Sequence, residues 1–246
     1  IEAVVGAVNV LESNPRFNAG VGGAIQSDGV CRTDAGLMTA NRRVGAACSM
    51  PGVCHAVDVA RLVMNETPHI FVSGEHAVSL AAAFGIETDV DLTTERTRER
   101  WAECEPPVGT TERLDWVREQ FGGTDTVGAV AVHEGEIAAA TSTGGRWCAL
   151  AGRVGDVPQV GSGFYASPAG GASATGAGED IARVTLSREA VRHVEAGKSP
   201  QEAAECAIAE FEELTDSTAG IIVLDSEGRA GSAYNSAMMQ TSIAQL

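Results

Sequence analysis

The sequence has few aromatic residues and almost no lysine. Aromatic residues occupy 4% of the 246 positions, and Lys198 is the only lysine. Because large rings are scarce, we expect a core of Val, Ala, Ile and Leu, with the 29 glycines allowing close backbone approaches. No apolar run reaches the ~18 residues needed to span a bilayer, and no secretory signal opens the chain. These absences predict a cytoplasmic protein with no membrane partner.

Positive charge is also in short supply. The sequence has 17 basic and 33 acidic residues, a formal net charge of −16. Such a surface repels nucleic acid and anionic lipid, which excludes both as expected partners. An acidic, lysine-poor surface suits solubility at high salt, so a halophilic source is a hypothesis, although GC-rich coding could produce the same bias.

The sequence lacks paired metal-ligand motifs. Its six cysteines form no CxxC pair, and its five histidines are isolated from one another. We therefore predict no zinc site and no Ser-His-Asp order, and we expect the cysteines to be buried free thiols.

Hydrophobic spacing predicts an alternation of short strands and helices. In the first half, we expect helices over 1–12, 57–65 and 75–84, a hairpin of 23–26 with 31–38, and strands over 44–49 and 70–72. In the second half, we expect a hairpin from Thr126, a glycine-rich tract over 144–178, helices over 179–196 and 199–214, and a hairpin of 219–224 with 230–234. Residues from about 88 to 125 are rich in Glu and Arg, with weak helical character over 93–104 and 111–120. We interpret them as a flexible linker that ends at Asp125, although an unprocessed surface excursion would have the same composition.

Thr126 opens an apolar strand directly after that linker. Cleavage of the Asp125–Thr126 bond would give Thr126 a free α-amine, which can serve as the general base for its own hydroxyl. Taken alone, the residue is better explained as an ordinary β-branched start of a strand. The motifs around it decide otherwise.

Several motifs in order resemble the plant-type asparaginase/isoaspartyl peptidase family. They are Thr126 to Ala131, Ala140 to Gly145, Gly152 to Asp156 and Thr175 to Glu179, with Phe17 to Gly20 and Asp34-Ala35 in the first half. The resemblance implies an α+β fold, a four-layer αββα sandwich of two mainly antiparallel sheets. It also implies an N-terminal-nucleophile hydrolase in which 1–125 and 126–246 become the two subunits of one domain after self-cleavage. The implied reaction is hydrolysis of the side-chain amide of L-asparagine, or of β-aspartyl dipeptides.

The resemblance also assigns roles to individual residues. It implies that Thr126 is the nucleophile, that Thr143 orients its hydroxyl, and that Thr175 and Gly176 form the oxyanion hole. Asn18 is similar to an asparagine near the nucleophile. Each of these residues could instead belong to an ordinary strand end or turn.

Substrate recognition is assigned in the same way. Arg153 and Asp156 resemble the residues that bind the substrate's α-carboxylate and α-amine, with Gly178 beside them, although Arg and Asp at this spacing could form a surface ion pair. The loop with Leu11, Glu12 and Phe17 resembles one that wraps a structural sodium ion with backbone carbonyls. No other cofactor is implied, and the implied assembly is a dimer of αβ heterodimers.

The chain departs from the family pattern in two places. It starts inside the first helix, where relatives begin with a strand carrying a His-Gly-Gly run, and we expect that such a strand precedes Ile1. Arg146 to Ala149 replaces a Thr-Asn-Lys-like run beside the pocket, where Trp147 could narrow the leaving-group side. A glycosylasparaginase-type hydrolase stays open as an alternative, as does a non-enzymatic ligand-binding protein that uses the glycines of 161–178.

The charge balance generates one testable prediction. If the acidic surface is adapted to salt, molar KCl will raise the melting temperature because it screens the repulsion among carboxylates. Thermal unfolding in 0.1 M and 2 M KCl measures this. Full stability in dilute buffer, with no gain from salt, would contradict the halophilic hypothesis.

Overall fold

The computed structural model describes residues 1–104, 112, 115–117 and 126–245. Its helices are α1 (Glu2–Glu12), α2 (Ala56–Glu66), α3 (Gly74–Ala83), α4 (Glu95–Cys104), α6 (Gly178–Val184), α7 (Leu186–Glu195) and α8 (Pro200–Leu214). Its strands are β1 (Arg32–Thr39), β2 (Val44–Pro51), β3 (Phe71–Ser73), β4 (Val127–His133), β5 (Glu136–Thr143), β6 (Phe164–Ser167), β7 (Gly170–Gly176), β8 (Ala219–Asp225) and β9 (Ala230–Tyr234).

The strands of the described chain form two sheets. One has the order β3-β2-β1-β5-β4 and the other has the order β6-β7-β8-β9. All pairings are antiparallel except the parallel pairing of β2 with β3. The central pairing of β1 with β5 joins the chain before residue 125 to the chain after it, so both halves build one sheet.

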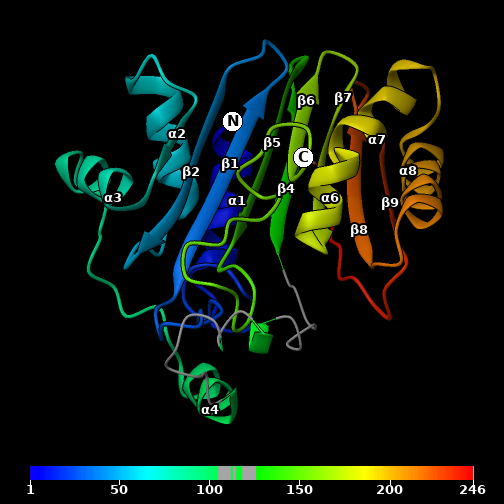
Figure 1. The fold of residues 1–246 in the computed structure, drawn as a ribbon. Helices are drawn as coiled ribbons and strands as arrows, with labels where there is room; N and C mark the ends of the chain where they lie inside the picture. The colour runs from blue at the N-terminus through cyan, green and yellow to red at the C-terminus, as the bar shows by residue number, and fades with distance from the viewer. Residues whose placement is uncertain (105–111, 113–114, 118–125, 246) are drawn as a thin grey trace.

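The two sheets stack face to face and helices cover both outer sides (Figure 1). Helices α1, α2 and α3 contact the five-stranded sheet, and α6, α7 and α8 lie on the other side of the sandwich. Each side has its own apolar core, which is rich in Ala and Val as the composition predicts. The expected αββα sandwich is confirmed.

Glycines on the facing strands let the sheets approach closely. A Cβ on Gly128 of β4 would lie 2.0 Å from Ser173 Oγ of β7, and a Cβ on Gly171 would lie 2.8 Å from Val130 Cγ1. From the first pair to the second, the position moves two residues forward along β4 and two residues back along β7. Because alternate residues share a face of a strand, the next facing pair in this series is Thr126 and Thr175.

Two of the predicted elements differ from the structure, and two strands were not predicted. Residues 23–26 make only the isolated bridge from Ile25 to Cys31, because glycines and a turn interrupt the segment. The predicted helix over 179–196 is two helices, since Thr185 between them has φ of 52°. Strands β6 and β7 form a hairpin inside the glycine-rich tract, whose small residues carry little hydrophobic alternation.

The hairpin also argues against the alternative of a ligand-binding protein that uses the glycines of 161–178 to hold a phosphate group. The strand residues 164–167 and 170–175 pair with each other and with β8, so their backbone does not present a row of free amides to an anion. The other predicted helices and strands are present within a few residues, including the Ser199 capping box that begins α8.

The segment predicted to be a flexible linker contains α4.

The expectation that all six cysteines are free thiols was wrong. Cys104, the last residue of α4, forms a disulfide with Cys148. The sequence could not pair them, since they lie 44 residues apart without a motif. Cys31, Cys48 and Cys54 are free and buried, as expected, and Cys206 is free and partly exposed. Asp125 lies outside the described residues.

No helix in the described part of the chain is both long and apolar enough to cross a membrane.

The α8 packing yields a stability prediction. Phe211 is 1% exposed within the core beneath α8, whereas Phe84 at the end of α3 is 55% exposed. We expect Phe211→Ala to lower the free energy of unfolding by about 3–5 kcal/mol through lost burial and a cavity. The matched variant Phe84→Ala should change it by less than about 1 kcal/mol. Urea unfolding of the two variants measures the difference, and equal losses would contradict this core assignment.

Candidate active site

Thr126 lies immediately before β4, where the chain enters the sheet. Its Oγ1 donates a hydrogen bond to Thr143 Oγ1 at 3.5 Å. Thr143 is the last residue of β5, which pairs with β4, and it is 4% exposed. Thr126 itself is partly exposed. The structure therefore brings together the two threonines that the sequence analysis linked, with one of them open to solvent.

Asn18 holds the loop that follows Thr143. Its Nδ2 donates to the Gly145 carbonyl at 2.6 Å, and its Oδ1 accepts from the Ala24 backbone N–H at 2.7 Å. Its own carbonyl accepts from the backbone N–H of Gly144 at 2.8 Å and from Thr143 Oγ1 at 3.4 Å. Asn18 is 5% exposed. The geometry makes it a support for Thr143 and the glycine pair.

Thr175 and Gly176 end β7 on the sheet that faces Thr126. Both are partly exposed, and the series set by the pairs Gly171–Val130 and Ser173–Gly128 predicts that Thr175 faces Thr126. Gly176 has φ of 136°, and a Cβ there would lie 2.4 Å from the Thr218 carbonyl oxygen. Only glycine tolerates both the backbone angle and the close neighbour.

Arg153 makes a bidentate ion pair that the sequence analysis missed. Its Nε and Nη2 donate to the two carboxylate oxygens of Glu179 at 2.9 and 2.8 Å. Arg146 Nη1 lies 3.8 Å from the same carboxylate. The pKa of Glu179 is below its usual value because these hydrogen bonds and charges outweigh its burial. Glu179 followed a glycine motif at a helix start, which gave no signal of a partner 26 residues away.

Asp156 lies buried beside Arg153. A Cβ on Gly178 would lie 2.7 Å from Asp156 Oδ1 and 2.8 Å from Arg153 Nη2, so both groups meet at this glycine. Asp156 is 4% exposed, and within the described part of the structure its Oδ2 has no hydrogen-bond partner. Burial raises the pKa of Asp156 to about 7. A buried carboxylate oxygen without a donor is suited to a cationic ligand.

Gln26 is a second residue that the sequence did not single out. Its Oε1 accepts from Arg32 Nη1 at 2.7 Å and from the Gly152 backbone N–H at 3.1 Å, and its Nε2 reaches the Arg153 carbonyl at 3.5 Å. Gln26 is 1% exposed. It therefore positions the backbone of the loop that carries Arg153.

Glu12, the last residue of α1, supports strand β5 of the five-stranded sheet. Ser142 Oγ donates to Glu12 Oε1 at 2.5 Å, and the Val57 backbone N–H donates to the same oxygen at 3.1 Å. Burial raises the pKa of Glu12 to about 8. Since Ser142 precedes Thr143 in β5, Glu12 anchors the strand that carries the site.

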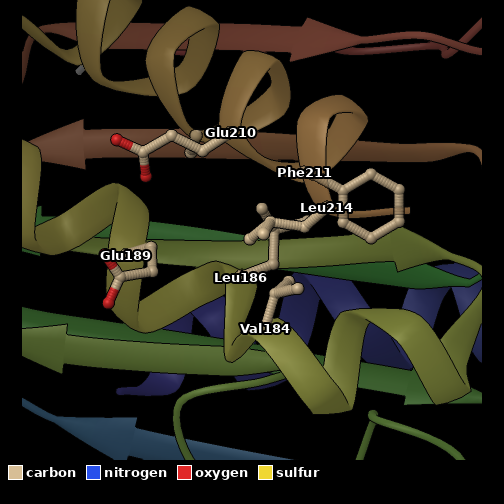
Figure 2. Close-up of a pocket in the computed structure, with 7 residues that line it drawn as sticks. Val184, Leu186, Glu189, Glu210, Phe211 and Leu214 are labelled. Atoms are coloured by element: carbon tan, nitrogen blue, oxygen red, sulfur yellow. The ribbon is translucent and has the colours of Figure 1, made fainter.

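The described residues contain no group of three or more His, Cys, Asp or Glu side chains arranged for a metal ion. A cavity of about 150 Å³ lies between α7 and α8 (Figure 2). It is lined by Val184, Leu186, Glu189, Ala207, Glu210, Phe211 and Leu214. None of these residues belongs to the group around Thr126, so this cavity is separate from the candidate site.

The fold and the site together define a class of enzyme. An αββα sandwich in which a threonine immediately before β4 is hydrogen-bonded to a buried threonine on β5 matches the arrangement expected of a threonine-type N-terminal-nucleophile hydrolase.

Comparison with known proteins then gives the family. The asparaginase family model matches residues 1–245. The chain is 39% identical to an isoaspartyl peptidase/L-asparaginase of Danio rerio, over 100% of this chain and 79% of the relative. It is 38% identical to a plant-type L-asparaginase of Pyrococcus abyssi, over 97% and 81% of the two chains, and 40% identical to an isoaspartyl peptidase/L-asparaginase of Bos taurus, over 97% and 78%. The chain belongs to the asparaginase family.

The buried Asp156 yields a prediction about stability and pH. Its pKa of about 7 lies above the ordinary value of 3.8, so the folded state holds the proton more tightly than the unfolded state. Its stabilising contribution is complete below the unfolded pKa and is lost as the pH rises through the folded one. We expect Asp156→Asn to gain at least about 1 kcal/mol relative to the wild type between pH 4.5 and 8.

Urea unfolding at the two pH values measures this change. Asp28→Asn is the matched control, because the hydrogen bonds and charge of Arg32 outweigh burial and lower the pKa of Asp28. The contribution of Asp28 is already complete above its unfolded pKa, so its variant should keep a constant difference from the wild type over that range. An Asp156→Asn difference that is also constant would contradict the assignment.

Proposed function

We propose that this protein hydrolyses the side-chain amide of L-asparagine and the β-aspartyl bond of isoaspartyl dipeptides. Membership in the asparaginase family supports the reaction class, and the names of the Danio rerio and Pyrococcus abyssi relatives support the two substrates. The observation that carries the proposal is Thr126, a partly exposed threonine at a strand start with its hydroxyl on buried Thr143.

In the proposed mechanism, the Asp125–Thr126 bond is first cleaved by the protein itself. The freed α-amine of Thr126 takes the proton of the Thr126 hydroxyl as the oxygen attacks the amide carbon of the substrate. Thr143 holds the hydroxyl in position. The Thr175 hydroxyl and the Gly176 backbone N–H stabilise the negative charge that develops on the carbonyl oxygen, a contribution typically worth about 3–4 kcal/mol for each donor.

Ammonia or the amino-terminal amine of the second amino acid leaves with a proton from the Thr126 amine. A water molecule then attacks the acyl-enzyme ester, and aspartate is released. The same amine accepts a proton from that water and returns it to the Thr126 oxygen. Each step uses one base that shuttles a single proton, so no further titrating residue is required.

Substrate recognition uses the pair at Gly178. The guanidinium of Arg153 offers five donors, of which Glu179 engages two. The remaining donors suit the α-carboxylate, while Asp156 Oδ2 suits the α-ammonium. Gly178 leaves the space that a side chain would fill between them. Both substrates carry this α-amino-acid group, so one pair serves both.

We also propose a structural sodium ion in the loop of Leu11, Glu12 and Phe17. A Cβ on Gly20 would lie 2.2 Å from the Glu12 carbonyl oxygen, and a Cβ on Gly22 would lie 2.9 Å from that of Phe17. Both glycines have positive φ, and a side chain at either position would clash with the neighbouring carbonyl oxygen, so the loop keeps these carbonyls close to its backbone. Carbonyl oxygens are ligands for hard cations. The ion would hold the loop before Asn18 and supply no chemistry.

We also propose an oligomeric assembly and a cellular compartment for the protein. The resemblance supports a dimer of αβ heterodimers, in which each domain consists of 1–125 and 126–246. The net charge of −16 supports a salt-rich cytoplasm. Size-exclusion chromatography with light scattering measures the assembly.

Cleavage gives the direct test of this mechanism. We expect intact mass spectrometry of the reduced protein to find two fragments, the second beginning Thr-Val-Gly-Ala-Val, with release of ammonia from L-asparagine and aspartate from a β-aspartyl dipeptide. Thr126→Ala should stay uncut and lose at least about 10²-fold in activity, since both nucleophile and base are lost. Thr67→Ala, at the end of α2, is the control and should behave as the wild type.

Two outcomes would refute the mechanism. One is a wild-type chain that stays uncut at both low and high salt. The other is a Thr126→Ala variant that is cleaved and active.

Removal of sodium provides a separate prediction. At equal ionic strength, the melting temperature should be higher in NaCl than in choline chloride, because only Na⁺ binds the folded loop. Thermal unfolding followed by circular dichroism measures the shift without reference to activity. Equal melting temperatures in the two salts would contradict the sodium site.

A further inference from the structure

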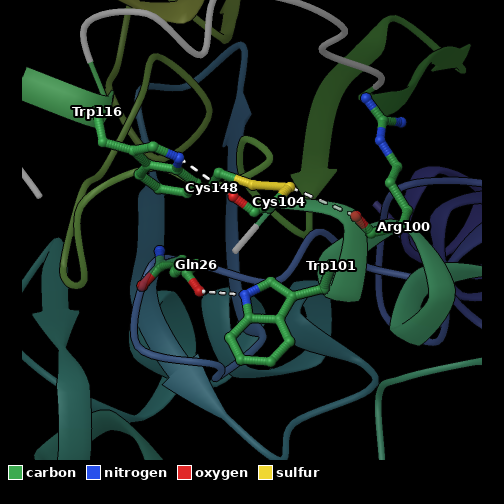
Figure 3. The surroundings of a disulfide bond; sticks show 6 residues. All are labelled: Gln26, Arg100, Trp101, Cys104, Trp116 and Cys148. Atoms are coloured by element: carbon green, nitrogen blue, oxygen red, sulfur yellow. Dashed lines mark hydrogen bonds between the residues drawn. A yellow bond between two sulfur atoms is a disulfide. The ribbon is translucent and has the colours of Figure 1, made fainter. Parts of the chain in front are cut away.

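Helix α4 belongs to the segment before the proposed cleavage bond, yet it is fastened to the part of the chain after that bond. Cys104 at its end forms a disulfide with Cys148 (Figure 3). Trp116 Nε1 donates to the Cys104 carbonyl at 3.2 Å, so Trp116 also packs at this point. The Cα atoms of the two cysteines are 7.1 Å apart, just beyond the usual range for disulfides. The bridge itself is therefore the first thing to measure.

Side chains of α4 cover the same loop. The guanidinium carbon of Arg100 lies 4.3 Å from the ring centroid of Trp147, an arrangement that favours a cation–π interaction. Trp147 is only 8% exposed and packs with Ala24, Ile25 and Cys148. The Cys148 backbone N–H donates to the Ile25 carbonyl at 3.0 Å. Trp147 is therefore packed beneath α4.

The helix also reaches the residue that positions the substrate-binding loop. Trp101 Nε1 donates to the Gln26 carbonyl at 3.2 Å (Figure 3). The side chain of the same Gln26 holds the Gly152 N–H and the Arg153 carbonyl. One end of α4 thus contacts the loop that follows Thr143, and its middle contacts the support of Arg153.

We propose that α4 stays docked in the mature enzyme as a wall of the substrate site, fastened by the Cys104–Cys148 disulfide. The inference rests on the proposed cleavage at Asp125–Thr126, after which this bridge joins the two fragments covalently. By holding Trp101 against Gln26, the wall positions Arg153 for the substrate carboxylate. The bridge therefore acts on substrate binding, whereas Thr126 and its amine carry the chemical step.

Formation of the Cys104–Cys148 bridge requires an oxidant, and a small disulfide can serve as that co-reactant. Formation of the bridge converts two thiols to one disulfide and releases two protons and two electrons, which reduce a small disulfide such as oxidised glutathione to two thiols. A dithiol reductant reverses the step and is itself oxidised to a cyclic disulfide. Of the four cysteines outside the bridge, Cys31, Cys48 and Cys54 are buried, and burial raises the pKa of their thiols, so these three are poor competitors for exchange.

The first experiment is intact mass spectrometry of the purified protein with and without dithiothreitol. We expect one covalent species without reductant and two fragments with it. Two separate fragments without reductant would overturn the inference while leaving the cleavage proposal in place. Alkylation of the denatured, unreduced protein gives an independent readout, because six cysteines less the two in the bridge leave four to be labelled.

The labelling separates the two proposals if no cleavage occurs. An uncut chain with four labels keeps the bridge and refutes the proposed maturation. Six labels refute the bridge, whether or not the chain is cut.

The kinetic experiment tests the positioning role. We expect Cys104→Ser to raise KM for L-asparagine about fivefold or more, with kcat changed less than twofold, and dithiothreitol to produce the same change in the wild type. Cys206→Ser, a free and partly exposed cysteine on α8, is the matched control and should leave both constants unchanged. Trp101→Phe keeps a ring but removes the donor to Gln26, so it should raise KM with the disulfide intact. An unchanged KM in Cys104→Ser, or a fall in kcat alone, would overturn the positioning role.

Discussion

The close approach of the two sheets is the constraint on which the rest of the structure depends. Gly128 and Gly171 remove side chains where β4 and β7 face each other, so Ser173 and Val130 fill the space. Buried Thr141 Oγ1 and Ser173 Oγ, 2.6 Å apart, add a hydrogen bond between the sheets. Continued by two residues, this register predicts that Thr126, immediately before β4, lies opposite Thr175 near the end of β7. The Thr126 hydroxyl bonds to Thr143 of its own sheet, whereas the proposed oxyanion donors Thr175 and Gly176 end β7 of the other sheet.

The sandwich also explains why carboxyl groups are buried beside this junction. Asp34 pairs across the sheet with Thr143, and its Oδ1 accepts from the Ser49 N–H at 2.7 Å. Burial raises the pKa of Asp34 to about 7, as it does for Asp156, and the charge of Arg153 acts on both in the opposite direction. Asp34 and Asp156 are buried near the same arginine in the folded protein, so their carboxyl groups are already desolvated before a ligand binds. A ligand that brings an ammonium and a carboxylate can pair with charges on both sides.

Several elements of this site could be predicted from local sequence. The strand that follows Thr126, the capping box of α8 and the apolar run of β8 beside its turn can each be predicted from a few neighbouring residues. The resemblance in motif order also pointed to Thr143, Arg153 and Asp156, and the structure brings Thr143 to Thr126 and Arg153 to Asp156. The roles of these residues stay predictions, and Asp125 lies outside the described residues.

What the sequence by itself determined is the class of fold, the order of its elements and the threonine at the centre of the argument, because each depends on short-range periodicity or a contiguous motif. The tertiary structure decided the partners: Glu179 for Arg153, Gln26 for the Gly152 loop, and Cys104 for Cys148. These pairs lie 26 to 126 residues apart in the chain. The spacing of apolar residues along a helix or strand does not predict such contacts, because they form only when the sheets stack and bring the loops at their ends together.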